Sequence, residues 1–208
     1  MQTFMENAQD KPLNAWHPSS EPRPQKPSFW HYVREWIKVI VVALVISLPI
    51  RFFIAEPFVV NGASMDPTFE SGQFLIVDRL SYETGTPARG DVTIFKYPNN
   101  PRVYYIKRTI GLPGETVRIT DGIVSIINAE HPDGFILDEP YIGNAYRSHD
   151  TSTFTLGPSQ YFVMGDNRTQ SSDSRAWGPL DEKFIIGRPL VRLLPLTSLS
   201  LFPGEYHE

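Results

Sequence analysis

RVYYIKRTIG, residues 102–111, is the stretch that decides the fold, because β-branched and aromatic side chains dominate it and no helical period runs through it. Gly, Pro, Asn and Asp separate it from several short runs of the same kind, which are QFLIVDR (73–79), DVTIFKY (91–97), ETVRI (115–119), IVSII (123–127), QYFVM (160–164) and FIIGRPLVRLL (184–194). Asp121-Gly122 between two of these runs is a favourable hairpin turn. The sequence therefore predicts that residues 56–208 form a mostly β domain, an antiparallel sandwich or barrel.

Composition excludes several classes of function. The chain has 208 residues and a formal net charge of -4, with no block of Lys and Arg, whereas a nucleic-acid binder carries a basic footprint. The absence of cysteine excludes cysteine nucleophiles, disulfides and thiolate metal sites. The five histidines are scattered, with no pair at metal-ligand spacing. We therefore expect no nucleic-acid partner, no metal and no cofactor.

WIKVIVVALVISLPIRFFI, residues 36–54, is the one strongly apolar run of the chain. Lys38 and Arg51 lie near its ends, aromatic residues lie on both flanks, and its length approaches the roughly 20 residues that cross a bilayer. We predict an N-terminal transmembrane helix with interfacial flanks over residues 29–55. A buried core helix is the alternative. A cleaved signal peptide fits less well, because the run begins late and lacks a small-x-small cleavage site.

The residues before this run are polar and rich in proline. Residues 1–28 cannot bury enough apolar surface to offset their ordering entropy, so we predict a disordered cytoplasmic tail. Lys and Arg precede the run at four positions, whereas none lies between residues 56 and 78. From the positive-inside rule we expect the chain to cross the plasma membrane once, with its N-terminus in the cytoplasm and residues 56–208 outside.

Four segments are too specific to be scaffold, and they occur in order after the apolar run: VVNGASMDPT (59–68), GDV (90–92), YIKRTIGLPGE (105–115) and GDNRTQSSDSRAWG (165–178). The first resembles the S-M-x-P-T box of type I signal peptidases. The others resemble the second short box, the lysine box and the closing box of that family. The resemblance covers most of residues 36–195, and it implies a membrane-anchored serine endopeptidase that removes N-terminal signal peptides from exported preproteins.

Ser64 is the candidate nucleophile on chemical grounds as well. It lies in a turn of small residues before Pro67, which can present a hydroxyl at the end of a strand. A serine hydroxyl is a poor nucleophile unless a neighbouring base takes its proton. No histidine lies in any of the four segments, which disfavours a Ser-His-Asp triad.

Lys107 is the remaining candidate base. Strand alternation puts it on one face with Tyr105 and Thr109, inside an apolar strand. Burial there would lower its pKa from about 10.4 and give a neutral amine that can accept a proton, as in Ser-Lys variants of the triad. The alternative is an edge-strand gatekeeper or half of an ion pair. Arg108 points to the opposite face, which indicates a structural role.

The resemblance assigns roles to further residues. It implies that Lys107 acts first as general base and then as general acid, and that the Ser171 hydroxyl orients it. Asp173 and Arg175 fall on the positions of a supporting ion pair. The Ser64 backbone N–H is the expected oxyanion donor. Gly62 stands where some members carry a second donor hydroxyl, which leaves that donor open.

The resemblance also implies the substrate site. Family members bind the cleavage region of the preprotein as an added strand, in shallow pockets that accept small side chains at the first and third positions before the cut. The residues expected to line these pockets are Phe58, Val60, Met65, Tyr105 and Ile106, for which plain β-core is the alternative. The expected partners are secretory preproteins and the lipid bilayer, with the enzyme acting as a monomer.

Two other functions are open to the same residues. A Ser-Lys autoprotease domain of SOS-type repressors would also need the dyad, but that class is soluble and attached to a DNA-binding domain. A membrane-tethered β module that has lost its activity would bind secreted partners without cutting them. The intact Ser64, Lys107 and Ser171 argue against this second alternative.

Overall fold

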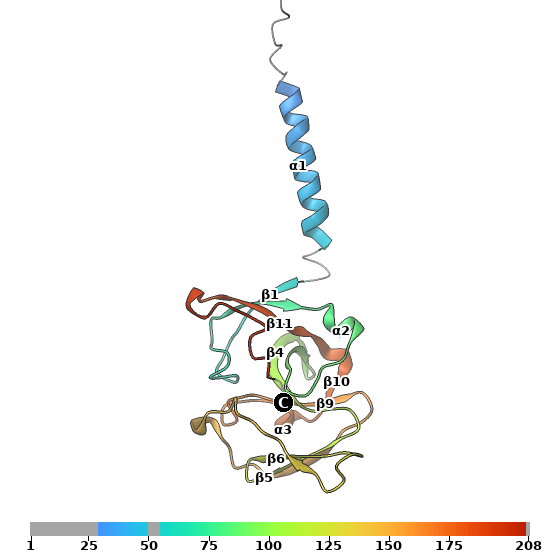
Figure 1. Ribbon diagram of the computed structural model, residues 1–208, viewed down its shortest axis with the longest axis vertical. Helices are drawn as coiled ribbons and strands as arrows, with labels where there is room; N and C mark the ends of the chain where they lie inside the picture. The colour runs from blue at the N-terminus through green and yellow to red at the C-terminus, as the bar shows by residue number, and fades with distance from the viewer. Residues whose placement is uncertain (1–28, 50–54, 207–208) are drawn as a thin grey trace, which may run out of the picture. The chain divides into compact units, whose positions relative to one another are not determined.

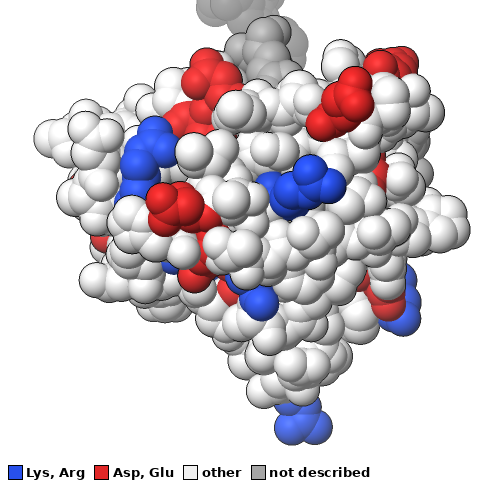
Figure 2. Space-filling model, turned by 90° about the horizontal axis from the view of Figure 1, so that it is seen from below, with Lys and Arg blue, Asp and Glu red and all other residues white. Residues whose placement is uncertain are grey.

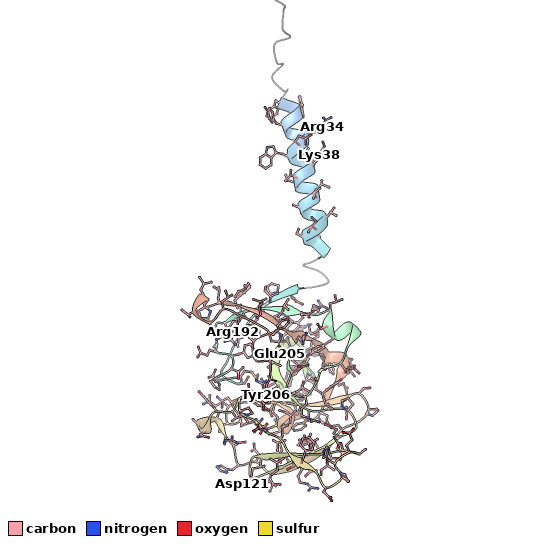
Figure 3. The ribbon with its side chains drawn as sticks, viewed as in Figure 1. Arg34, Lys38, Asp121, Arg192, Glu205 and Tyr206 are labelled. Atoms are coloured by element: carbon pink, nitrogen blue, oxygen red, sulfur yellow. The ribbon has the colours of Figure 1, made fainter. Side chains whose placement is uncertain are left out.

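The computed structural model describes residues 29–49 and 55–206. The first of these ranges is one apolar helix, α1 (Phe29–Pro49), in which Glu35 and Lys38 form an ion pair at 2.7 Å. Arg34 and Lys38 lie in its N-terminal half (Figure 3). No helix among the described residues has both the length and the apolar character needed to span a bilayer. The predicted tail, residues 1–28, and the end of the apolar run, residues 50–54, lie outside the described residues.

Most of the short β-branched runs of the sequence form strands of the larger of two sheets (Figure 1). Its strands are β1 (Ala55–Val59), β2 (Phe74–Asp78), β3 (Val92–Tyr97), β4 (Asn100–Gly111), β9 (Gln160–Met164), β10 (Leu180–Asp181), β11 (Ile185–Leu194) and β12 (Ser200–Leu201). They pair in the order β1-β2-β11-β3-β4-β9-β10, with β12 added beside β11, and every pair is antiparallel. β4 is the longest, and it pairs with β3 at its start and with β9 at its end.

A smaller antiparallel sheet consists of β5 (Thr116–Thr120), β6 (Ile123–Ile127), β7 (Phe135–Ile136) and β8 (Ser152–Thr155), in the order β7-β6-β5-β8. Asp121 and Gly122 join β5 to β6 with φ values of 49° and 78°, the two positive angles that a type I′ hairpin requires. A Cβ at Gly122 would overlap the Ser148 carbonyl, so only glycine fits there. Figure 3 shows Asp121 at the far end of this sheet.

Three apolar clusters hold the domain together. The largest joins the two sheets, because it takes Ile110 from β4 and Phe162 from β9 together with Val117 of β5 and Val124 of β6. A second cluster lies under the β1–β2 connection and contains Val60, Met65, Phe69, Leu75 and Val92. A third contains Phe95, Tyr161, Val163 and Leu180. On the face seen from below, scattered Lys and Arg residues lie among Asp and Glu residues on a mostly uncharged surface (Figure 2).

The helices of this domain are short, because no helical period of useful length runs through residues 56–208. Among the described residues they are α2 (Ser81–Thr84), α3 (Ser174–Trp177) and the 3₁₀ turns at Asn144–Tyr146, Glu182–Phe184 and Leu196–Ser198. The predicted antiparallel, mostly β architecture is therefore confirmed for this domain.

Candidate active site

Ser64 lies in the turn between β1 and β2, which we call the nucleophile turn (residues 61–69). Met65 and Phe69 anchor it in the core, at 1% and 0% exposure, and the Phe69 N–H donates to the Met65 carbonyl at 2.8 Å. Gly62 has a φ of +94°, which side-chain-bearing residues rarely adopt. The turn is therefore held at its base by apolar packing and shaped at its start by glycine, and it leaves Ser64 half-buried.

Lys107 comes from β4, where it pairs with Thr93 of β3. Its Nζ lies 2.7 Å from Ser64 Oγ and donates to the Ile106 carbonyl at 2.8 Å. The side chain is 3% exposed, and no described carboxylate lies within ion-pair distance of Nζ. Neither an exposed gatekeeper nor half of an ion pair matches this environment. The geometry instead brings an amine to the hydroxyl that it would activate.

The environment of Lys107 favours its neutral form. Burial is the main cause, and it lowers the pKa of Lys107 from 10.5 to about 8, because an ammonium loses its hydration there. The negative charges of Asp173 and Asp166 act in the opposite direction and raise this pKa. A pKa of about 8 leaves a useful fraction of free amine near neutral pH.

The closing segment, residues 165–175, is bonded directly to the nucleophile turn. The backbone N–H of Asn167 donates to the Ser64 carbonyl at 3.1 Å, and its side-chain Nδ2 donates to the Ala63 carbonyl at 3.0 Å. The Oδ1 of Asn167 accepts from Thr169 Oγ1 and from the Gln170 N–H, at 2.9 and 3.1 Å. Asn167 is 2% exposed, and its bonds to the Ala63 and Ser64 carbonyls join the backbone of the nucleophile turn to the closing segment.

Ser171 lies beside this junction but does not bond to Lys107. A Cβ at Gly165 would overlap both Ser171 Oγ and the Ser64 carbonyl, which puts the serine hydroxyl close to the nucleophile turn. Ser171 Oγ is buried and has no hydrogen-bond partner among the described residues. Its role in orienting Lys107 therefore stays a prediction.

The expected ion pair of Asp173 and Arg175 is formed. Arg175 Nε and Nη2 donate to the two carboxylate oxygens of Asp173 at 2.8 and 2.7 Å, and Asp173 is fully buried. Arg175 also pairs with Asp150 and donates to Ser148 Oγ at 3.1 Å and to the Arg168 carbonyl at 2.8 Å. Burial alone would lower the pKa of Arg175, but the carboxylates of Asp173 and Asp150 raise it above its usual range.

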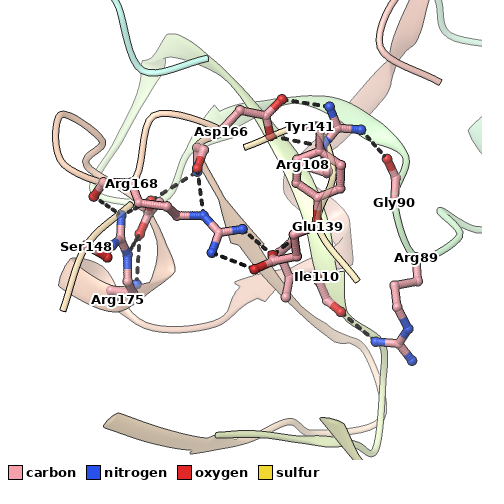
Figure 4. Close-up of polar contacts among 12 residues, drawn as sticks. Arg89, Gly90, Arg108, Ile110, Glu139, Tyr141, Ser148, Asp166, Arg168 and Arg175 are labelled. Atoms are coloured by element: carbon pink, nitrogen blue, oxygen red, sulfur yellow. Dashed lines mark hydrogen bonds and ion pairs between the residues drawn. The ribbon is translucent and has the colours of Figure 1, made fainter. Parts of the chain in front are cut away.

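Two further arginines, Arg108 and Arg168, form buried ion pairs at the closing segment (Figure 4). Arg108 bonds both carboxylate oxygens of Asp166, at 2.9 and 2.6 Å, and both side chains are almost fully buried. Arg168 pairs with the buried carboxylate of Glu139 and donates through Nε to the Gly165 carbonyl at 3.0 Å. As the strand alternation predicts, Arg108 serves structure and does not contact Ser64.

A cavity of about 260 Å³ opens at the Ser64–Lys107 pair. Of the five predicted pocket residues, four line it: Phe58, Val60, Tyr105 and Ile106. Met65 does not, because it points into the core under the turn. Leu75 and Ile94 also line the cavity, and so do Tyr104, Gln170 and Ser172.

Sequence reasoning missed these additional lining residues for identifiable reasons. Leu75 and Ile94 occupy inward-facing positions in the strand alternation of β2 and β3. The sequence pattern cannot distinguish an inward-facing residue that lines a pocket from one that only packs in the core. Gln170 and Ser172 belong to the closing segment, where the motif drew attention to Ser171 instead. Tyr104 could have been found from β4, because it immediately precedes the two lining residues that were predicted.

Ser64 also offers a backbone donor. No described residue accepts a hydrogen bond from its N–H, whereas the Gly62 N–H donates to Ser71 Oγ at 3.3 Å. An unpaired N–H beside the nucleophile is what an oxyanion site requires.

The sequence comparisons with known proteins indicate one family. A family model described as "Signal peptidase, peptidase S26" matches residues 33–194. A protein of Synechocystis sp., "Probable signal peptidase I-1", is 40% identical over 178 residues, which cover 82% of this chain and 87% of that protein. The "Signal peptidase I" of Bacillus licheniformis is 37% identical over 175 residues, which cover 79% and 90%. The crystal structure of a signal peptidase I from Enterococcus faecalis V583 covers 50% of this chain and 97% of its own, with 31% identity and a TM-score of 0.42.

Proposed function

The chain belongs to the signal peptidase family, peptidase S26, and on that premise we propose that it cuts signal peptides from preproteins with Ser64 as nucleophile and Lys107 as general base. Members of this family are hydrolases of peptide bonds. The single observation that carries the assignment is the distance of 2.7 Å between Lys107 Nζ and Ser64 Oγ at a lysine that is 3% exposed.

The reaction needs one proton carrier. With Lys107 neutral, its lone pair accepts the Ser64 hydroxyl proton while Oγ attacks the scissile carbonyl carbon. When the tetrahedral intermediate collapses, the C–N bond breaks and Lys107 returns that proton to the leaving nitrogen. An ester of Ser64 remains. Water then attacks the ester with Lys107 again as base, which releases the new carboxyl terminus and restores the serine hydroxyl.

Charge develops on the substrate carbonyl oxygen in both steps. We assign its first donor to the Ser64 N–H, which is unpaired among the described residues. Gly62 has no side chain to give a second hydrogen bond, so a second donor would come from water or from another amide. We assign the orientation of Lys107 to Ser171, whose buried hydroxyl has no other partner among the described residues.

The cavity suits an extended peptide. Over Tyr104–Arg108, β4 pairs with β3 on one side, and among the described residues its other side is paired only from Arg108 onward, by β9. β1 pairs only with β2 within the same described part of the chain. A substrate strand beside these edges would place alternate side chains, the first and third before the cut, on one side. Val60 and Ile106 would then limit those positions to small residues.

Membrane attachment is part of the proposal. It is supported by the apolar run at residues 36–54, with Lys38 and Arg51 near its ends and cationic residues before it. An anchor there would hold the domain outside the cytoplasm, where the cleavage sites of exported preproteins emerge.

The proposal is tested by incubating the detergent-solubilised full chain with a preprotein and reading the cut site by mass spectrometry. We expect one cut after a small residue, and none with Ser64→Ala. Ser159→Ala, the same substitution at an exposed serine that does not line the cavity, is the matched control. Cleavage by Ser64→Ala at the wild-type rate would remove Ser64 from the mechanism.

A further inference from the structure

The C-terminal turn, residues 202–206, packs against the back of the nucleophile turn although it follows it by more than 130 residues. Gly204 has a φ of +80°, and a Cβ on it would come within 2.8 Å of Phe69 Cε2, 2.9 Å of Val92 Cγ2 and 3.1 Å of Thr68 Cγ2. Phe69 is fully buried, and Pro203 is buried beside Gly204. A side chain at residue 204 would therefore intrude on Thr68 and Phe69 of the nucleophile turn.

Arg108 connects the same C-terminal turn to the catalytic strand. Its Nη1 donates to the carbonyls of Gly204 and Gly90, each at 2.7 Å, while Nε and Nη2 bond Asp166. The guanidinium carbon lies 3.9 Å from the centroid of the Tyr141 ring (Figure 4). Arg108 directly follows Lys107 in β4, so any shift of Gly204 would be felt at the residue next to the base.

Thr68 connects the nucleophile turn to this network from the other side. Its Oγ1 donates to Asp166 Oδ2 at 2.6 Å, and its carbonyl accepts from Arg192 Nη2 at 2.9 Å. Asp166 is thus shared between Arg108 and Thr68, and it immediately precedes Asn167, which bonds the Ser64 carbonyl. The nucleophile turn is fixed at both ends, by Asn167 at Ser64 and by Asp166 and Gly204 at Thr68.

We propose that the C-terminal turn, through Gly204, Arg108 and Thr68, is a positioning element that sets the Ser64 hydroxyl at hydrogen-bond distance from the Lys107 amine. These residues contact neither the cavity nor the reacting atoms, and they act through the nucleophile turn. The inference rests on the proposed roles of Ser64 and Lys107. It matters for rate because a general base works only within about 2.6–3.2 Å of its proton donor, and a misplacement of about 1 Å can cost about 100-fold.

Gly204→Ala is the direct test. The added methyl group must push against Phe69 and Thr68, so we expect kcat to fall by about tenfold or more while KM changes less than about threefold. We also expect the midpoint of the pH–rate profile to move to higher pH, because a loosened turn rehydrates Lys107. Gly114→Ala is the matched control, since Gly114 has a φ of +82° and nothing within 4 Å of its added Cβ. It carries the same backbone strain without the intrusion.

Thr68→Val is the second variant, in case Gly204→Ala does not fold. It removes only the hydroxyl that bonds Asp166 and keeps the shape of the side chain. We expect kcat to fall by about threefold to tenfold with KM unchanged. Thr116→Val is its control, because Thr116 Oγ1 bonds Thr155 Oγ1 at 3.0 Å on the exposed side of the smaller sheet.

The outcomes separate this inference from the proposed function. If Ser64→Ala retains activity, the proposed function fails and the positioning role fails with it. If Ser64→Ala is inactive but folded Gly204→Ala and Thr68→Val match their controls in kcat and in pH midpoint, the positioning role alone is overturned. A Gly204→Ala chain that does not fold leaves the decision to Thr68→Val, for which an unchanged kcat overturns the role.

Discussion

The carboxylate of Asp173 accepts a hydrogen bond from the backbone N–H of Gly165 at 3.0 Å. Asp173 is fully buried and also pairs with Arg175. The ion pair is therefore bonded to Gly165, whose lack of a side chain leaves room for Ser171 Oγ and the Ser64 carbonyl. The pair therefore supports the shape of the closing segment and does not need to touch substrate to affect the rate.

Asp173→Asn should be strongly destabilising. It leaves the Arg175 guanidinium partly buried without its main counter-charge, and loss of one partner of a buried pair typically costs about 3–5 kcal/mol of unfolding free energy. Urea unfolding followed by fluorescence measures the change. Asp121→Asn removes the carboxylate of an exposed pair with His149 and should change the free energy by no more than about 0.5 kcal/mol. Similar losses for both variants would contradict the supporting role.

The activity of the wild-type protein should rise with pH. The base must be unprotonated, so kcat/KM should increase as pH rises and level off above the pKa of Lys107, about 8. Lys107→Arg keeps a positive charge and much of the stem, but a guanidinium does not give up its proton in this range. We expect this variant to fold and to be inactive in a preprotein cleavage assay. Activity within about tenfold of wild type would mean that another group takes the serine proton.

The substrate pocket should discriminate by size. A preprotein with Ala at the first and third positions before the cut should be processed, and one with Phe there should be refused, because a clash with rigid strand residues such as Val60 and Ile106 costs more than a missing contact. Mass spectrometry of the products measures both. Met65→Leu should leave this preference unchanged, since Met65 is a core residue. Equal cleavage of the Ala and Phe substrates would rule out the pocket assignment.

Much of this fold follows from local sequence. The runs at residues 102–111 and 123–127 form strands because their side chains suit a pleated, half-buried surface, and Asp121-Gly122 forms its turn because both residues tolerate positive φ. The sequence does not predict the short strands β1, β7, β8, β10 and β12. Their sequences show little alternation of apolar and polar residues. They are strands because they pair with a neighbouring strand, as Ala55 of β1 pairs with Asp78 of β2.

Some features of the candidate site can likewise be predicted from sequence, whereas others depend on tertiary packing. Ser64 and Lys107 are 43 residues apart and could be paired only through motif resemblance and the chemistry of serine. The family resemblance implies a pocket role for Met65, but its side chain packs in the core, because the direction of a turn residue depends on the core beneath it, here Phe69 and Leu75. The contact of Gly204 with the nucleophile turn depends on how the last strand returns across the sheet, which no local pattern encodes.

Topology is predicted from the distribution of Lys and Arg around residues 36–54. In spheroplasts, external protease should digest residues 56–208 and leave the proline-rich residues 1–28 intact. Antibodies against each part, with lysed spheroplasts as the control for accessibility, measure the result. Digestion of the N-terminal part in intact spheroplasts would reverse the orientation and separate the site from exported substrates.

The low pKa of Lys107 should also be visible as stability. The unfolded lysine keeps its proton up to about pH 10.5, whereas the folded one loses it near pH 8, so between these values the unfolded state binds more protons and the folded state gains stability as pH rises. Lys107→Met removes this titration while it keeps an unbranched apolar stem. The unfolding free energy of the wild type, relative to Lys107→Met, should therefore increase by about 2 kcal/mol between pH 7 and pH 10.

Denaturant unfolding at a series of pH values measures this difference. Lys183→Met, which removes a lysine whose side chain is 70% exposed, gives the slope caused by loss of a positive charge alone. Below pH 8 the folded wild-type protein holds a charged amine in a buried site that disfavours it. The unfolding free energy of Lys107→Met should therefore come close to that of the wild type, or exceed it, in this pH range. A wild-type curve parallel to that of Lys107→Met would show that Lys107 keeps its proton in the folded state, and an amine that keeps its proton could not serve Ser64 as a base.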